Sequence, residues 1–248
     1  MKELLKFEFH KLWKQKSFYI CLIVMIALAF IGIVLSKELA SHPQLEIALP
    51  TLESVLLSCV STSSFTLIAG IFTALFICTD FDQMTIKNIY SRGFSKGAVY
   101  LAKYFVSIIG TIVLFLAMLL ATFIAGQMLL NGKEISSQVI TLLLGQFAYC
   151  LAVISFVFVI SILVKKTGVS IALAILGPSL IGTVFSLADS LLKLESFKMN
   201  DYWLESFIKD LSIASVSSSR MTICILFSII YLVMFTGIGY IFHNKQEN

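Results

Sequence analysis

The stretch that decides the fold is residues 138–164, QVITLLLGQFAYCLAVISFVFVISILV, which contain no charged residue and no histidine. A helix needs about 20 apolar residues to cross roughly 30 Å of hydrocarbon, so this run is long enough to span a membrane. Five more runs also lack Asp, Glu, Lys, Arg and His: residues 18–36, 59–79, 104–130, 169–188 and 221–242. A β-barrel would show short alternating strands instead. The sequence therefore predicts an all-α integral membrane protein with six transmembrane helices.

The composition excludes several other classes of protein. Of the 248 residues, 58% are apolar and 13% are charged, and the mean hydropathy is +0.97. Soluble domains carry about 25% charged residues, and disordered chains are less apolar still. The five cysteines show no Cys-x-x-Cys spacing, so we expect them to pack as small apolar residues rather than bind metal or form disulfides. We interpret residues 1–248 as one transmembrane domain.

The basic residues predict the orientation of the bundle. Twelve of the 18 Lys and Arg lie in the N-terminus, residues 80–103, Lys165–Lys166 and the C-terminal tail. Cytoplasmic loops carry an excess of basic residues, so both termini are expected in the cytoplasm, with the chain multi-pass in the cell membrane. The net charge of +4 is then a topology signal, and nucleic acid is not an expected partner.

Three segments outside the spans have their own patterns. Residues 1–17 alternate basic and bulky apolar side chains, which predicts an interfacial helix with lysines facing anionic membrane lipid; the alternative is a basic tail that only sets topology. Residues 37–58 contain two prolines and are predicted to be irregular. In residues 189–220, the stretch Trp203–Leu211 has apolar residues at i, i+1, i+4, i+5 and i+8, which predicts an amphipathic outer insert of one or two helices.

Two features inside the spans affect helix shape and packing. Small residues recur every four positions at Ala117, Ala121 and Ala125, a spacing that lets helix backbones approach closely. Gly177 and Pro178 fall near the middle of the fifth span, where they predict a kink or a helix break.

The sequence shows no constellation for catalysis. All three histidines lie outside the spans, so a haem, metalloprotease or Ser–His site within the membrane is not supported. Asp80-x-Asp82 has no companion acids and is weak as a metal site. No Gly-x-x-x-x-Gly-Lys-Ser/Thr motif occurs, so we expect no ATP site, no metal and no cofactor on this chain, and no enzymatic activity of its own.

The most informative polar segment is residues 80–103, which mix exposed apolar side chains with charges between two spans. One interpretation is a loop that only sets topology. The other is a docking element for a cytoplasmic protein, in which apolar anchors supply burial and charges supply register. The candidate docking residues are Asp80, Phe81, Asp82, Thr85, Arg92 and Lys96.

This organisation resembles the permease subunit of ABC-2 type ABC transporters. The shared features are an amphipathic N-terminal helix, six spans, a cytoplasmic loop after the second span and an outer insert before the sixth. The loop of that family typically reads Glu, then Gly-Thr, then a Ser-Arg-like segment and a Lys. The corresponding residues here are Asp80, Thr85, Ser91-Arg92 or Ser95-Lys96, and Lys103, with Met84 in place of the glycine.

The resemblance implies half of an ATP-driven exporter. Two permeases would pair as a homodimer or heterodimer, and each coupling loop would seat in a separate P-loop ATPase that binds ATP and Mg²⁺. Permeases of this size are similar to those with which Gram-positive bacteria export bacteriocins, lantibiotics or peptide antibiotics, so the implied role is antimicrobial peptide resistance. The alternatives are a non-catalytic membrane scaffold or assembly factor, and a secondary transporter, which the charge-free spans disfavour.

Overall fold

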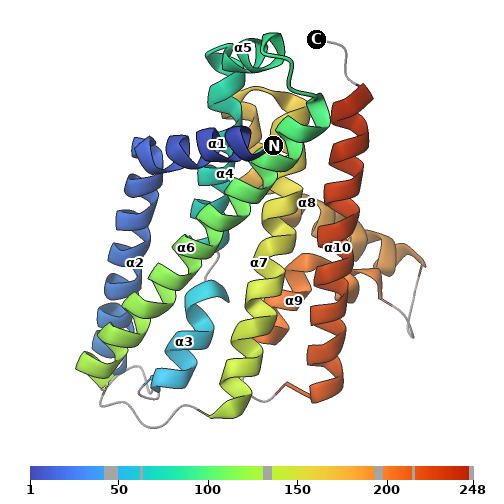
Figure 1. The fold of residues 1–248 in the computed structure, drawn as a ribbon. Coiled ribbons are helices and arrows are strands. Elements are labelled where there is room, and N and C mark those ends of the chain that lie inside the picture. Colours follow the sequence, from blue (N-terminus) through green and yellow to red (C-terminus); the bar gives the residue numbers. More distant parts are fainter. Residues whose placement is uncertain (42–49, 62–63, 131–135, 193–197, 214–215, 246–248) are drawn as a thin grey trace.

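The computed structural model describes residues 1–41, 50–61, 64–130, 136–192, 198–213 and 216–245, and the regular elements within these ranges are all helical. They are α1 (Lys2–Lys14), α2 (Lys16–Ser41), α3 (Leu52–Ser61), α4 (Ser64–Asp82), α5 (Thr85–Ser91), α6 (Lys96–Leu130), α7 (Ser137–Val164), α8 (Thr167–Leu192), η1 (Met199–Tyr202), α9 (Leu204–Leu211) and α10 (Ser218–Lys245). The long helices form a bundle, and α1 lies across one end of it (Figure 1). The helix α5 and the end of α10 lie at that same end, which we call the α1 end.

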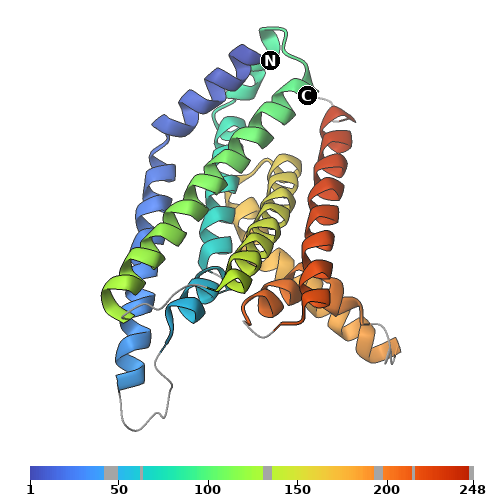
Figure 2. The same ribbon diagram turned by 60° about the horizontal axis from the view of Figure 1, so that its bottom comes forward.

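Among the described residues, six segments are long and apolar enough to cross a membrane: α2, α3 together with α4, α6, α7, α8 and α10. The predicted all-α fold with six transmembrane helices is therefore confirmed. Of the six, α7 is the most buried and α10 the least. The helix α7 thus lies inside the bundle, whereas α8 and α10 leave much apolar surface uncovered; the end of α8 projects from the side of the bundle (Figure 2).

The boundaries of two helices differ from the prediction. The helix α6 begins at Lys96 rather than at residue 104, and α4 continues to Asp82 rather than ending at residue 79. The predicted spans were free of charge, but these helices carry Lys103 and Asp80 inside them. The two side chains are 2% exposed and paired with each other, which explains how helical structure can continue through them.

The prediction that residues 37–58 are irregular was wrong in part. The helix α2 continues to Ser41, and α3 begins at Leu52, while residues 42–49 lie outside the described residues. Thr51 and Ser54 cap α3 reciprocally: the Ser54 N–H donates to Thr51 Oγ1 at 3.2 Å and the Thr51 N–H donates to Ser54 Oγ at 3.0 Å. Thr51 directly precedes the first residue of α3, and Thr is among the residue types preferred at helix N-caps.

The described part of residues 189–220 contains the predicted amphipathic helix, α9, while its outer location stays a prediction. Its stripe of five predicted residues is buried, and α9 packs against α7, α8 and α10. The Gln146 amide on α7 donates to the carbonyls of Leu57 and Leu211, at 2.8 and 3.1 Å. This amide therefore ties α3 and α9 to the centre of the bundle.

The helix α8 runs without interruption through Gly177 and Pro178, so the predicted helix break is not found. Two contacts support the chain at this point. The indole N–H of Trp203 donates to the Pro178 carbonyl at 2.8 Å, and a Cβ at Gly177 would lie 3.0 Å from the Phe156 ring. These contacts hold α8 in place at the position where proline removes one hydrogen bond from the helix.

The small residues of α6 pack against other helices of the same chain. Ala121 and Ala125 are buried, and Ala125 packs with Ile33 of α2 and Val55 of α3, while Ala117 is half-buried. At Gly110, farther along α6 towards the α1 end, three helices approach closely. A Cβ at Gly110 would lie 2.8 Å from the Phe72 ring of α4 and 3.3 Å from Leu12 Cδ1 of α1.

This contact predicts that Gly110→Ala destabilises the bundle. The added methyl group meets the buried Phe72 ring, and overpacking of this kind costs about 1–3 kcal/mol. The free energy of unfolding, measured by SDS titration in mild detergent, should fall accordingly. Gly237→Ala is the matched control, because a Cβ there meets nothing within 4 Å. Equal stability of the two variants would contradict the close approach at Gly110.

Candidate functional site

The segment 80–103 is helical over most of its length. The helix α5 is bounded by two residues with positive φ, Met84 at 54° and Gly93 at 84°. A left-handed conformation costs a residue other than glycine roughly 1–2 kcal/mol. Met84 therefore adopts the geometry that the glycine of the resembled loop would supply without strain. The turn at Met84 places α5 beyond the end of α4, and the turn at Gly93 directs the chain back into α6.

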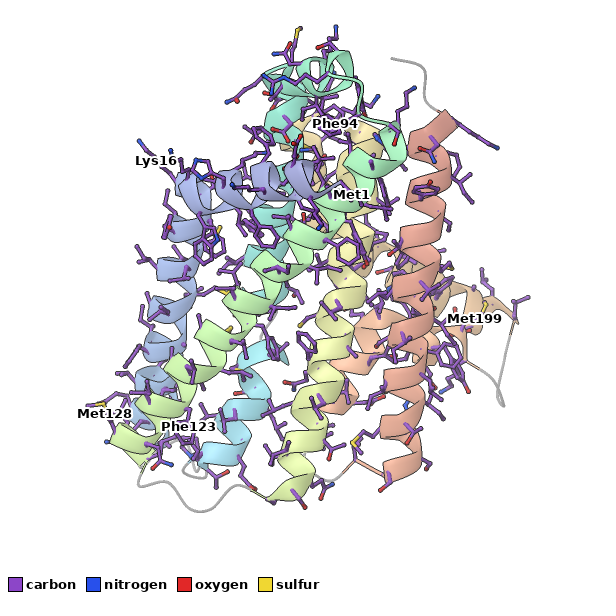
Figure 3. All side chains as sticks on the ribbon, in the orientation of Figure 1. Met1, Lys16, Phe94, Phe123, Met128 and Met199 are labelled. Carbon is purple, nitrogen blue, oxygen red and sulfur yellow. The ribbon has the colours of Figure 1, made fainter. Side chains whose placement is uncertain are left out.

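A groove of about 410 Å³ lies between α1 and α5. Its lining residues are Glu3, Leu4 and Phe7 of α1 together with Thr85, Asn88, Ile89, Arg92 and Phe94. Leu4 and Ile89 belong to one buried cluster, so the floor is apolar, while the rim carries one acidic and one basic side chain. Phe7 is 43% exposed, and Phe94, at the α1 end (Figure 3), packs against the cluster that contains Leu4 and Ile89. The groove thus offers an apolar floor with a polar rim.

Four charged residues from three helices meet beside this groove. The Lys103 ammonium of α6 pairs with Asp80 of α4, and it lies 2.8 Å from Glu8 Oε1 of α1. The Lys11 ammonium of α1 lies 2.6 Å from Asp80 Oδ2. We call Glu8, Lys11, Asp80 and Lys103 the ion quartet. Its formal charges cancel, and two of its three ion pairs join α1 to the bundle.

Lys11 is the member of the ion quartet nearest to solvent, with its side chain 18% exposed. Its ammonium donates to the Phe76 carbonyl at 3.0 Å and lies 4.4 Å from the centroid of the Phe76 ring. Burial, followed by repulsion from Lys103, lowers the pKa of Lys11 below its usual value. Glu8 is fully buried, and its Oε2 has no hydrogen-bond donor among the described residues.

The structure separates the six candidate docking residues into two groups. Thr85 and Arg92 line the groove. The other four lie elsewhere: Asp80 is in the ion quartet, Asp82 accepts a hydrogen bond from Thr167 at the start of α8, Phe81 lies beneath the Lys165 ammonium, and Lys96 begins α6. Asp80 is 2% exposed, and its carboxylate contacts Lys11 of α1 and Lys103 of α6.

Sequence reasoning missed the contribution of α1 to this site. The amphipathic pattern placed most charges on the outer face, yet Glu8 lies on the buried face with Leu4 and Leu12. The signal was present as the spacing i, i+4, i+8 of these three residues, which puts a carboxylate in line with two leucines. An acid in that position requires a buried cation, and Lys103 supplies it.

The end of α10 contacts α5. The Tyr90 hydroxyl lies 3.1 Å from Nε2 of His243, and the His243 ring stands 5.7 Å from that of Tyr100 on α6. Burial raises the pKa of Tyr90, so its hydroxyl keeps its proton near neutral pH. The helix α5 is therefore connected to the bundle on two sides, through the α1 groove and through α10.

Comparison with known families agrees with this architecture. The model of the family described as "ABC-2 family transporter protein" matches residues 4–180, from α1 into α8. The chain belongs to the ABC-2 family of transporter proteins. A search of the curated proteins found no match. The match to the ABC-2 family covers all four residues of the ion quartet and every lining residue of the groove except Glu3. It identifies the chain as a multi-pass membrane component of an ABC transport system.

The geometry of this ABC-2 protein predicts that Lys103→Met is strongly destabilising. The change leaves the fully buried Glu8 without its cation, and breaking a buried ion pair from one side costs about 3–5 kcal/mol. The free energy of unfolding in detergent measures the loss. Lys87→Met, at an exposed position on α5, is the control and should change stability by less than about 0.5 kcal/mol. A Lys103→Met protein as stable as this control would show that the buried pairing is not required.

Proposed function

We propose that this chain is the membrane-spanning half of an ATP-driven exporter and that the groove between α1 and α5 docks a separate P-loop ATPase. The carrying observation is the groove itself, at the end of the bundle that the basic residues assign to the cytoplasm. Apolar anchors in a desolvated centre and charges at the rim are the usual features of a protein-binding surface. ATP and Mg²⁺ would bind to that partner, since this chain has no phosphate-binding glycine loop.

The proposed assembly contains a second permease. The helices α2, α8 and α10 leave many large apolar side chains exposed, which suits contact with lipid and with a second copy or a sister chain.

The proposed substrate is amphipathic, such as an antimicrobial peptide or a drug-like compound taken from the bilayer. A shallow groove of about 420 Å³ between α6 and α10 supports this class of substrate. It is lined by Leu101, Tyr104, Leu232, Val233, Thr236, Gly237 and Tyr240. The Tyr104 hydroxyl accepts a hydrogen bond from Thr236 Oγ1 at 2.7 Å, so these two polar groups pair with each other, and the exposed lining of the groove is mostly apolar.

Affinity purification from native membranes in mild detergent tests the assembly. The expected result is a stoichiometric soluble protein that carries a P-loop, with vanadate-sensitive ATP hydrolysis in the preparation. A second permease in the preparation would mark a heterodimer. A solitary protein without ATPase, purified under conditions that preserve native contacts, would favour the membrane scaffold or a secondary transporter instead.

The groove predicts which side chains hold the ATPase. Phe7→Ala and Arg92→Glu should each weaken association at least 10-fold, because they remove an apolar anchor and reverse a rim charge. Titration of the purified ATPase against the permease in nanodiscs gives the dissociation constants. Trp13→Ala is the matched control, since Trp13 is an exposed aromatic residue of the same helix outside the groove. If all three variants bind as tightly as the unmodified chain, the ATPase docks elsewhere.

A further inference from the structure

We infer that the ion quartet is a latch with two settings, which are two alternative ways of pairing its four charges. Glu8, Lys11 and Lys103 are the positioning residues whose exchange of partners lets α1 move with its ATPase. This inference rests on the proposed function for its role in transport. Which of the two pairings the four charges adopt depends on this chain alone.

The setting in the structure holds α1 against the bundle. Glu8 is 2.8 Å from Lys103, and Lys11 is 2.6 Å from Asp80, so both acid–base contacts of α1 cross to another helix. The groove depends on this setting, because Leu4 and Phe7 of α1 form one of its walls. Holding α1 in place therefore holds the docking surface in shape.

The second setting is available without any new charge. Glu8 and Lys11 are separated by three positions on one helix, the spacing at which side chains of opposite charge pair along a helix face. Lys103 and Asp80 are already paired across α4 and α6. If α1 shifts, Glu8 can pair with Lys11 while Lys103 and Asp80 remain together. Neither part is then left with an uncompensated buried charge, which would otherwise prevent the movement.

Two details of the quartet fit an exchange rather than a fixed anchor. Glu8 Oε2 has no hydrogen-bond donor within the described part of the chain, so one acceptor is open for the Lys11 ammonium. The Lys11 side chain is 18% exposed against 2% for Lys103, so Lys11 is the cation with room to move. Asp80 contacts both lysines at once and therefore keeps a partner when Lys11 leaves.

The two settings give different outcomes for different substitutions. Glu8→Gln removes the deeper contact of α1, and the remaining Lys11 can reach water, so α1 should loosen. Lys11→Gln also removes one contact, but Glu8 then has Lys103 as its sole cation and α1 should stay in place. The exchange Glu8→Lys with Lys103→Glu keeps opposite charges facing each other across α1 and α6. In that double variant the released setting would leave two lysines on α1 and two acids in the bundle, so α1 should be locked.

Distances between spin labels test the latch. Cysteines that replace Lys6 on α1 and Asn244 at the end of α10 are exposed, whereas the five native cysteines are buried, so labelling is selective. In the isolated permease in nanodiscs, we expect one distance for the unmodified quartet and for Lys11→Gln. We expect an added population at a different distance for Glu8→Gln. Equal loosening by Glu8→Gln and Lys11→Gln would overturn the exchange, because it would make the two contacts independent anchors.

A second arm uses the complete complex. With the ATPase and a non-hydrolysable ATP analogue bound, the unmodified quartet should shift to the second distance, and the Glu8→Lys/Lys103→Glu variant should bind the ATPase yet keep the first distance. A double variant that follows the unmodified protein would also overturn the latch. The two failures are distinguishable, because absence of an ATPase removes the proposed function and leaves the measurement on the isolated permease intact.

Discussion

The burial of one ammonium group governs the α1 end of this protein. Lys103 is 2% exposed and is surrounded by carboxylates from two other helices, Glu8 of α1 and Asp80 of α4. A buried cation without such partners would be prohibitively costly, so in this structure the ends of the three helices are held together. Through Glu8, the same interaction sets the position of α1, and α1 forms one wall of the groove beside α5. The shape of the groove is thus a consequence of an electrostatic requirement in the bundle.

Much of the fold could be predicted from local patterns. Hydrophobic runs longer than a bilayer crossing indicated the six spans, and the stripe from Trp203 to Leu211 indicated α9, because both depend on residues close together in the sequence. The ion quartet could not be found in this way. Its members come from three helices, and Glu8 and Lys103 are far apart in the chain. Charged residues at the ends of apolar runs were assigned to loops, whereas pairing allows the helices to continue through them.

In the candidate site, too, features within one segment could be predicted from the sequence, whereas contacts between distant segments could not. Segment 80–103 stood out because of its mixture of charges and apolar residues, and Thr85 and Arg92 line the groove. Sequence patterns did not reveal that Asp80 points into the bundle or that Phe7 of α1 completes the opposite wall. The left-handed Met84 has a similar explanation: the surrounding helices impose a conformation that the residue itself disfavours.

The most direct test of the central claim, that α1 and α5 form one docking surface, is photo-crosslinking in native membranes from two single positions. A photoreactive amino acid would replace Phe7 on α1 or Asn88 on α5, both of which line the groove. The expected result is that both positions capture the same P-loop ATPase, identified by mass spectrometry. Capture from Asn88 alone would contradict the claim, because α1 would then lie outside the interface.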